Sequence, residues 1–221
     1  MSADVPQVKI GKSPGTPLNA ALSFWLPPNT PFGNLTIKHY KIITRLDRVN
    51  ALLQQIYQIH PVLLSTEIHV MNGYESYCYS IEEVIFHLRR AADEMISMYS
   101  LLMNFEKIGS YASQVSMDHI GALLHNEMTK SNPPFVEHLT LLGQLNEISN
   151  AFKHSFVNSD ISLIGVLEPC VHALALKLNK LEKGIVFHNM ALREVVEGYN
   201  NFYIEINSWL RGFSERHRDK G

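Results

Sequence analysis

The chain has few of the residues that mark disulfide-rich or metal-binding proteins. It carries two cysteines in 221 residues, Cys78 and Cys170. They match no metal-ligand spacing, so we expect neither a disulfide framework nor a zinc module, and a reducing cytoplasm is the simplest location. Long apolar runs are also missing, because residues 18–26 run into two prolines and residues 161–178 are broken by Glu168. We therefore expect no membrane span and no signal peptide.

Charge of one sign is not in excess either. Lys and Arg number 19, Asp and Glu 21, and the net charge is −2 with histidine neutral. Bulk positive charge therefore does not attach this protein to nucleic acid, although a local basic patch could do so. The chain has no Gly-x-x-x-x-Gly-Lys phosphate loop, no Gly-x-Gly-x-x-Gly fingerprint and no Gly-x-Ser-x-Gly elbow. We expect no bound cofactor, and the length suits one domain with one core.

The first 33 residues hold six of the ten prolines. They predict an irregular N-terminal arm that lies over the core through Phe24, Trp25 and Leu26. A single helical domain is expected over 34–213, followed by a polar tail over 214–221. Its first helix begins near 34, with Ile43, Leu46, Leu53 and Tyr57 as its apolar stripe, and is predicted to end before Pro61.

Two local signals then predict an interruption between helices. Residues 62–74 alternate at period two, which predicts a short extended segment closing at Asn72-Gly73. Ser80 and Glu83 have the spacing of a capping box, so a second long helix is expected over 81–106. Two ion pairs are expected along its solvated face, namely Arg89 with Asp93 and Arg90 with Glu94.

The second half predicts three more elements. A short helix is expected over 117–128, and Asn132-Pro133 supplies a cap and a first-turn proline for a helix over 134–157. Apolar runs at 171–178 and 184–188 flank a polar turn and predict a β-hairpin.

A last helix is expected directly after the hairpin. Asn189 is its predicted cap, and its apolar seam comprises Leu192, Val195, Val196, Tyr199, Phe202, Ile206 and Leu210. The predicted fold is therefore mainly α, an antiparallel helical bundle with a small β-hairpin inserted before the last helix.

The predicted helix over 134–157 has two contrasting faces. Its apolar face comprises Leu141, Leu145, Ile148, Phe152 and Phe156. Glu147, Asn150 and His154 lie almost opposite, with Lys153 beside them. A histidine can transfer a proton near neutral pH, an asparagine can orient it and a lysine can hold a phosphate, as a phosphodiester-cleaving site requires. The alternative is a polar helix end facing solvent, where His154 and Lys153 complement the helix dipole.

The stretch Asn-Ala-Phe-Lys-His-Ser at 150–155 resembles the signature helix of the HEPN superfamily. The resemblance implies a helical, often dimeric protein, and in the catalytic branches a metal-independent endoribonuclease. That family's motif places an arginine and a polar residue before a histidine. Asn150 matches the polar position and His154 the histidine.

The motif arginine is absent from this chain. The three places allowed for it hold Glu147, Ile148 and Ser149. The resemblance implies that arginine and histidine of two protomers meet at a dimer interface, and Lys153 is not equivalent to a guanidinium fork. The expectation is thus a homodimer that uses the exposed face of the 134–157 helix and binds RNA or a nucleotide, as a degenerate or altered endoribonuclease. The alternative is a non-enzymatic helical interaction protein.

A basic row is the second candidate feature. Lys38, Lys41, Arg45 and Arg48 lie within about 80° on the first helix and could follow phosphates, or could form an ordinary solvated face. The C-terminal end adds further cations, Arg211, Arg216, Arg218 and Lys220.

Metal ligation is the third possibility considered. The candidate ligands are Asp118, His119, His125 and Glu127, or Glu83 with His87. His119 and His125 do not share a helix face, and the paired Glu-x-x-His motifs of a di-metal bundle are lacking. We therefore expect no metal centre. An arginine brought near His154, such as Arg89 or Arg90, would favour the RNA hypothesis, whereas burial of His154 on a backbone partner would favour the interaction protein.

Overall fold

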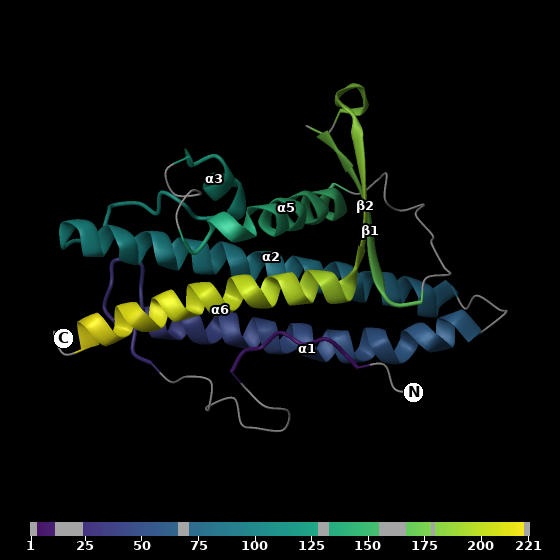
Figure 1. Cartoon of the computed structure of the whole chain (residues 1–221), viewed down its shortest axis with the longest axis horizontal. Coiled ribbons are helices and arrows are strands. Elements are labelled where there is room, and N and C mark those ends of the chain that lie inside the picture. The colour runs from purple at the N-terminus through teal and green to yellow at the C-terminus, as the bar shows by residue number, and fades with distance from the viewer. Residues whose placement is uncertain are drawn as a thin grey trace.

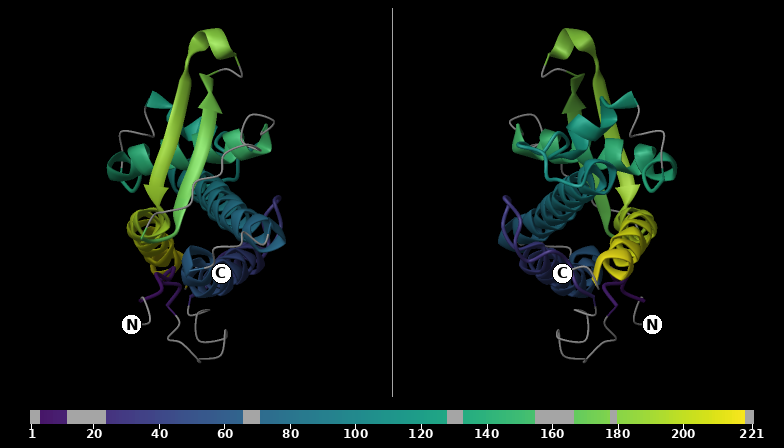
Figure 2. Two further views of the ribbon diagram at one scale, coloured as in Figure 1. Left: turned by 90° about the vertical axis from the view of Figure 1, so that its right-hand side faces the viewer. Right: turned by 90° about the vertical axis from the view of Figure 1, so that its left-hand side faces the viewer.

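The computed structural model confirms a mainly α fold with one β-hairpin before the last helix. Three long helices run along the molecule, a shorter helix lies over one of them, and the hairpin crosses the end of the shorter helix and projects outward (Figures 1 and 2). The structure describes residues 4–11, 24–65, 71–127, 133–154, 167–177 and 180–218.

Helix α1 spans Leu35–Ser65, and its apolar stripe is buried as predicted. The prediction that it ends before Pro61 is wrong, because Pro61 lies inside its last turn. Proline there removes one N–H donor from the helix. The neighbouring His60 is buried, and its Nδ1 lies 2.9 Å from the hydroxyl of Tyr77 on the next helix, a tertiary contact that supports the turn.

Helix α2 spans Met71–Ile108, so the extended segment predicted over 62–74 is wrong where it is described; residues 66–70 lie outside the described part. The capping box is wrong as well. Ser80 lies within the helix and donates its hydroxyl to the carbonyl of Ser76 at 2.8 Å. Glu83 instead accepts from Arg48 Nε of α1 at 3.2 Å. The two helices pack as an antiparallel pair whose side-chain contacts outweigh these local signals.

Helix α3 covers only Ile120–Leu124, shorter than the predicted 117–128. Its first N–H, that of Ile120, donates to Asp93 Oδ1 at 2.8 Å, so α2 supplies the carboxylate that caps it. Burial raises the pKa of Asp93, which is 8% exposed, although this hydrogen bond and Arg89 act in the opposite direction. Asp93 is therefore not on the solvated face predicted for it. Both predicted ion pairs nevertheless form, Arg89 with Asp93 at 3.9 Å and Arg90 with Glu94 at 2.9 Å.

The expected helix over 134–157 begins later. A 3-10 turn, η2, spans Val136–His138 and leads into α5, Leu139–Lys153, while residues 155–157 lie outside the described part. Pro133 therefore belongs to the preceding turn and is not a first-turn proline, and Asn132 lies outside the described residues. Of the expected apolar face, Leu145 and Ile148 are buried in the core, and Leu141 and Phe152 are half-buried against it.

The hairpin is confirmed. Strand β1, Cys170–Leu176, pairs antiparallel with β2, Ile185–Ala191, and a 3-10 turn, η5, at Leu181–Lys183 closes the tip. Asn189 lies opposite His172 in the sheet, so its predicted role as a helix cap is wrong.

Helix α6 spans Leu192–His217, beyond the predicted end of the helical domain at 213. Its first N–H, from Leu192, bonds to the carbonyl of Pro169 at 2.8 Å, so the chain preceding the hairpin closes this helix end. At the other end Arg216 pairs with Glu106 of α2 at 2.7 Å, which extends the helix into the expected tail. The predicted seam of α6 is buried in the core.

The N-terminal residues that the structure describes are irregular, as expected. Leu26 is fully buried, and the ring of Phe24 lies 5.0 Å from that of His39 on α1. Residues 4–11 also lie on the bundle, through Val8 and Ile10. Among the described residues no helix is long and apolar enough to cross a membrane.

Candidate functional site

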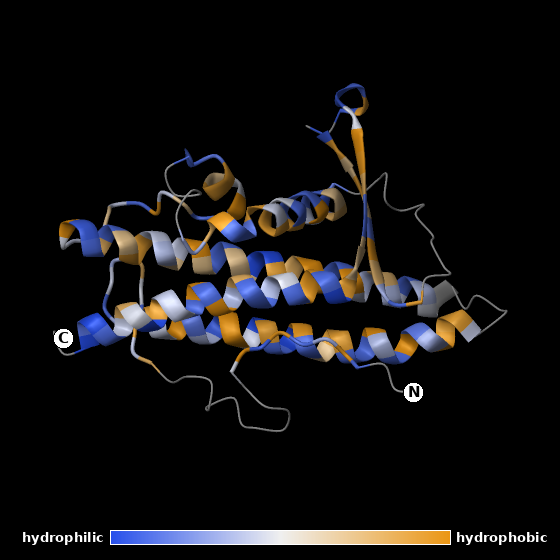
Figure 3. Ribbon diagram, in the orientation of Figure 1, coloured by the Kyte–Doolittle hydropathy of each residue, from blue (hydrophilic) through white to orange (hydrophobic). Residues whose placement is uncertain are grey.

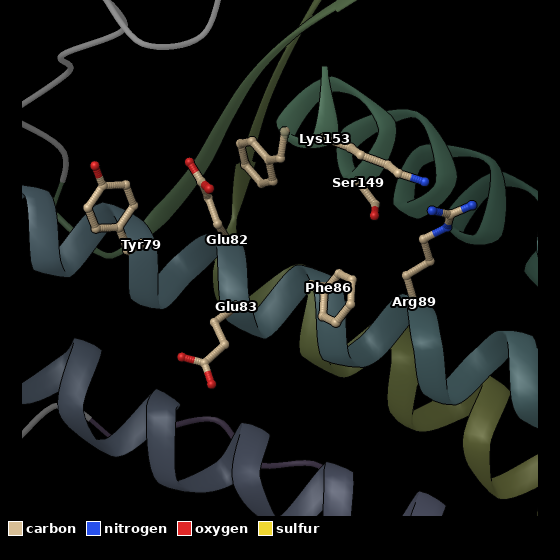
Figure 4. Close-up of a pocket in the computed structure, with 8 residues that line it drawn as sticks. Tyr79, Glu82, Glu83, Phe86, Arg89, Ser149 and Lys153 are labelled. Carbon is tan, nitrogen blue, oxygen red and sulfur yellow. The ribbon is translucent and has the colours of Figure 1, made fainter. Parts of the chain in front are cut away.

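A groove between α2 and α5 contains the most suggestive combination of side chains. Its volume is about 410 Å³. Figure 4 shows that two cationic side chains, one from each helix, approach each other at one end. The lining residues are Tyr79, Glu82, Glu83, Phe86, Arg89, Ser149, Phe152 and Lys153.

Arg89 supplies the cation from α2. Its Nη2 donates to Asn146 Oδ1 of α5 at 3.2 Å, and its Nε lies 3.9 Å from Asp93 Oδ2. That Nε is buried and makes no hydrogen bond to a described residue. These neighbours hold the guanidinium across the gap between the helices, and the side chain is only 18% exposed. Arg89 is therefore positioned before any ligand arrives.

Asn146, Ser149 and Lys153 of α5 recur every three or four residues and so share one face. Ser149 and Lys153 line the groove, and Asn146 holds Arg89 beside it. Ser149 is 5% exposed, whereas Lys153 is exposed in the last turn. Figure 4 shows the Lys153 ammonium and the Ser149 hydroxyl on the side of the groove where Arg89 lies. This end of the groove can present two positive charges and a hydroxyl to one anionic group.

Aromatic rings form the walls. Tyr79 and Phe86 are 63% and 57% exposed on α2, and Phe152 is half-buried on α5. Two acids, Glu82 and Glu83, lie at the other side of the groove. Burial raises the pKa of Glu82. Burial also acts to raise the pKa of Glu83, but the hydrogen bonds and positive charges of Arg48 and His87 together outweigh it and lower that pKa. The groove thus has a cationic end, apolar walls and an acidic side.

The predicted polar residues of α5 have different surroundings, because Lys153 lines the groove whereas Glu147 and His154 do not. At about 100° per residue, Glu147 and His154 lie on a different face of α5 from Lys153. Glu147 Oε2 is 3.3 Å from Nε2 of His188, a buried residue of β2, without the geometry of a hydrogen bond. The face expected to serve a dimer contact is therefore partly beside the hairpin.

His154 is neither next to an arginine, as the RNA hypothesis expects, nor buried on a backbone partner, as the interaction-protein hypothesis expects. It is exposed at the end of α5, and its backbone N–H bonds to the carbonyl of Asn150 at 3.0 Å, an ordinary helical contact. Arg89 reaches α5, but on the side of Lys153, and His154 does not line the groove. Arg90 is turned toward Glu94.

Ser149 and the aromatic walls were not predicted as site residues, and Arg89 was considered only as a possible neighbour of His154. A signal was present: Tyr79, Glu82, Phe86 and Arg89 follow one another at spacings of three and four, which marks one stripe of α2. The stripe carries two exposed aromatic rings and therefore differs from an ordinary solvated face. Only the packing of α5 beside it shows that the stripe forms a groove.

The predicted basic row is largely neutralised by α2. Arg45 lies 3.3 Å from Glu94, and Arg48 lies 3.2 Å from Glu83. Lys38 and Lys41 are exposed at a second cavity of about 620 Å³ between α1 and α2. The two arginines thus join the helices, whereas Lys38 and Lys41 make no ion pair with a residue that the structure describes.

The cations of the C-terminal end are likewise dispersed. Arg211 lies over the ring of Phe24 at 5.0 Å, and Arg216 is paired with Glu106. Arg218 follows the end of α6, and Lys220 lies outside the described residues.

The metal candidates do not converge in the part of the chain that the structure describes. Asp118 Oδ1 and His119 Nδ1 lie 2.5 Å apart, and Glu83 lies 3.2 Å from His87. His125 and Glu127 are exposed. No group of three or more metal-ligating side chains occurs among the described residues. Cys78 and Cys170 are both free thiols.

No protein-family model, curated protein or solved structure matches this chain.

Proposed function

We propose that this is a HEPN-like helical protein that binds RNA or a nucleotide in the groove between α2 and α5. The observation that carries the proposal is the meeting of Arg89 and Lys153 at one end of the groove, beside the Ser149 hydroxyl (Figure 4). The carboxylate of Asp93 lies 3.9 Å from Arg89 on one side, and an anion placed between Arg89 and Lys153 is attracted by both cations. A phosphate group suits this position, because it accepts hydrogen bonds from guanidinium, ammonium and hydroxyl groups together.

The walls of the groove suit the other parts of a nucleotide. Phe86 and Tyr79 expose ring surface, and unpaired bases stack on such rings with little dependence on sequence. The acidic side, at Glu82, can accept hydrogen bonds from ribose hydroxyls or from exocyclic amines. The combination favours a single-stranded ligand over a duplex, whose bases are already stacked.

Cleavage is a separate part of the proposal. His154 and Asn150 are the residues carried from the family resemblance. Asn150 lies one turn before Lys153 on α5, whereas His154 follows Lys153 in sequence and lies about 100° from it around the helix axis. A strand held by Lys153 has to pass over this helix end to reach His154. A histidine there can transfer a proton to or from the attacking 2′-hydroxyl or the leaving oxygen.

The first test replaces Lys153 by alanine. Binding of a labelled mixed-sequence single-stranded RNA is expected to weaken by roughly three- to tenfold at moderate salt, and the slope of log affinity against log salt is expected to fall by about 0.7. The physical reason is the loss of one phosphate contact and its released counterion. Fluorescence anisotropy over a range of salt concentrations measures both quantities.

Lys183→Ala is the matched control, since Lys183 is an exposed lysine at the hairpin tip, away from the groove. Equal losses in the two variants would show that binding depends on net charge alone and would remove the groove from the proposal. The same RNA, incubated in chelator with wild type and with His154→Ala, separates binding from cleavage. Cutting by wild type only would make His154 catalytic, and cutting by neither would leave a binding protein.

A second candidate function, interaction with a protein partner, is favoured by the hairpin. Ile185, Val186 and Phe187 are 51%, 47% and 46% exposed. Figure 3 shows a hydrophobic outer half that projects from the bundle beneath a hydrophilic tip. Neither β1 nor β2 contains a charged residue, although exposed edge strands ordinarily carry charges that prevent pairing. Such an uncharged apolar ribbon is typical of a surface that a partner covers.

Phe187→Lys tests this candidate in its homodimer form. If the hairpin joins two copies, sedimentation velocity is expected to show a concentration-dependent dimer for wild type and a dissociation constant at least tenfold higher for the variant, because a charge is placed on the apolar face. Ile37→Lys is the control, since Ile37 is 53% exposed on α1 and lies outside the hairpin. A wild type that remains monomeric throughout, or an equal effect of both substitutions, would contradict pairing through the hairpin.

A further inference from the structure

The N-terminal segment 4–11 lies between α1 and α6 and is held by side chains of both helices. Val8 donates its N–H to Asn50 Oδ1 at 2.7 Å, and its carbonyl accepts from Asn50 Nδ2 at 3.1 Å. On the other side, Lys9 donates its N–H to Asn200 Oδ1 at 2.7 Å, and the carbonyl of Gln7 accepts from Asn200 Nδ2 at 2.9 Å. Two side-chain amides, one from each helix, therefore hold consecutive peptide groups of this segment.

The hydrogen bonds from Asn50 and Asn200 recognise the backbone of the segment and not its side chains. An asparagine amide has one acceptor oxygen and a donor nitrogen, so it can imitate the peptide group of a neighbouring strand. Successive residues of the segment bond alternately to α1 and to α6, as expected for an extended backbone whose polar groups point to opposite sides. The segment then turns at Lys9, where the N–H of Ile10 donates to the carbonyl of Val8 at 3.0 Å.

Three side chains of the segment are buried, namely Pro6, Val8 and Ile10, and the two aliphatic ones give the contact its selectivity. Val8 is 2% exposed and Ile10 4% exposed, and both belong to the hydrophobic core. The residues beside them, Gln7 and Lys9, line an open cavity of about 950 Å³ shared with Gln54 of α1 and Val196 of α6. Arg193 of α6 additionally donates to the carbonyl of Asp4. The site therefore accepts a peptide with two aliphatic residues two positions apart.

The binding surface is complete without the covalent link to the segment. Asn50, Asn200 and Arg193 all belong to α1 or α6, and the chain from 12 to 23 separates the segment from the next described residue. A connection of twelve residues can span up to about 40 Å. The same contacts can therefore be made by a segment of this sequence that comes from another molecule.

We propose that the groove formed by α1 and α6 is a peptide-binding site, and that its ligand in trans is the segment 4–11 of a second copy of this chain. The segment of the same copy is a competing ligand, and its high effective concentration keeps the site filled when copies are dilute. Exchange of the segment links two copies. This proposal is independent of RNA binding and of the hairpin.

The test uses the full chain with its own segment disabled. Val8→Asp combined with Ile10→Asp places carboxylates where the structure buries aliphatic groups, so the segment is expected to leave the groove. A fluorescent peptide with the sequence of residues 4–11 is then titrated and its anisotropy measured. We expect saturable binding to this variant and binding to the unmodified chain that is at least about tenfold weaker, because few of its sites are open.

Two controls locate the binding. A peptide carrying Val8→Asp is expected to lose at least tenfold in affinity. Adding Asn50→Leu to the disabled chain removes one amide that holds the backbone and is expected to weaken the peptide by a similar factor. Both results would identify the groove as the binding site.

A milder variant, Val8→Ala with Ile10→Ala, keeps the test decisive if the aspartate variant fails to fold. Its cooperative thermal transition shows that the bundle is intact, and the same order of affinities is expected. A folded variant that does not bind the peptide would overturn the proposal. So would equal affinity for the variant and the unmodified chain, since the peptide would then bind elsewhere.

Discussion

Replacing His39 by glutamine is expected to remove about 3 kcal/mol of the pH dependence of unfolding between pH 7 and pH 4. His39 lies on α1 and is 3% exposed. Its Nε2 is 3.0 Å from Asn207 Oδ1 of α6, so the neutral ring donates a hydrogen bond to this amide. Glutamine can make the same donation without titrating.

The size of the effect follows from the pKa of His39. Burial lowers it from 6.5 to about 4, the hydrogen bond to Asn207 acts in the opposite direction, and the positive charge of Arg211 lowers it further. Because the unfolded chain binds this proton at a higher pH than the folded chain, the stabilisation is fully present above pH 6.5. It is lost as the pH falls from 6.5 toward 4.

Urea unfolding of both proteins at several pH values between 7 and 4 measures this contribution. The carboxylates titrate in both chains, so the difference between wild type and His39→Gln isolates the histidine. The two free energies of unfolding are expected to converge as the pH falls, because wild type loses stability faster. A constant difference over the whole range would mean that His39 is not held neutral in the fold.

Replacing Phe202 by alanine is expected to lower the free energy of unfolding by about 3–5 kcal/mol. Phe202 is fully buried on α6, and its ring lies 5.8 Å from those of Tyr199 and His138. The substitution removes the buried ring and leaves a cavity where α6 and the 3-10 turn before α5 meet, and the surrounding helices can collapse into it only in part.

The control is Ile204→Ala on the same helix. Ile204 is 46% exposed, so its truncation is expected to change the free energy of unfolding by about 0.5 kcal/mol or less. Chemical unfolding with a common baseline slope compares the two variants. Similar losses in both would show that helix propensity, and not packing of the ring, determines the effect.

Elements with strong hydrophobic periodicity could be predicted from the sequence. The seam of α6 and the stripe of α1 repeat at helical spacing, and the structure buries them. The hairpin was predictable because two short apolar runs flank a polar turn. Each of these patterns involves residues close in sequence and defines which face of the element is apolar. That face is buried whichever element packs against it, because apolar surface is driven out of water.

Element boundaries were predicted less well, since single residues signal them weakly. Pro61 did not end α1, Ser80 did not begin α2, and Asn189 became part of β2. Each local preference amounts to about 1–3 kcal/mol, which contacts with another element can exceed. The carboxylate that caps α3 belongs to Asp93 of α2, 27 residues before Ile120. A contact at that separation cannot be predicted from the residues around the start of α3.

Hydrophobic periodicity and the polar turn are enough to predict amphipathic helices with one hairpin, and a polar cluster at the end of α5. They do not predict which of those polar residues lie together, because that depends on the packing of the elements. Packing of α2 against one face of α5 joins Lys153 to Arg89, whereas the hairpin brings His188 to Glu147. The physical reason is that periodicity fixes the angle of a side chain around its own helix axis, but not which neighbouring helix that angle faces.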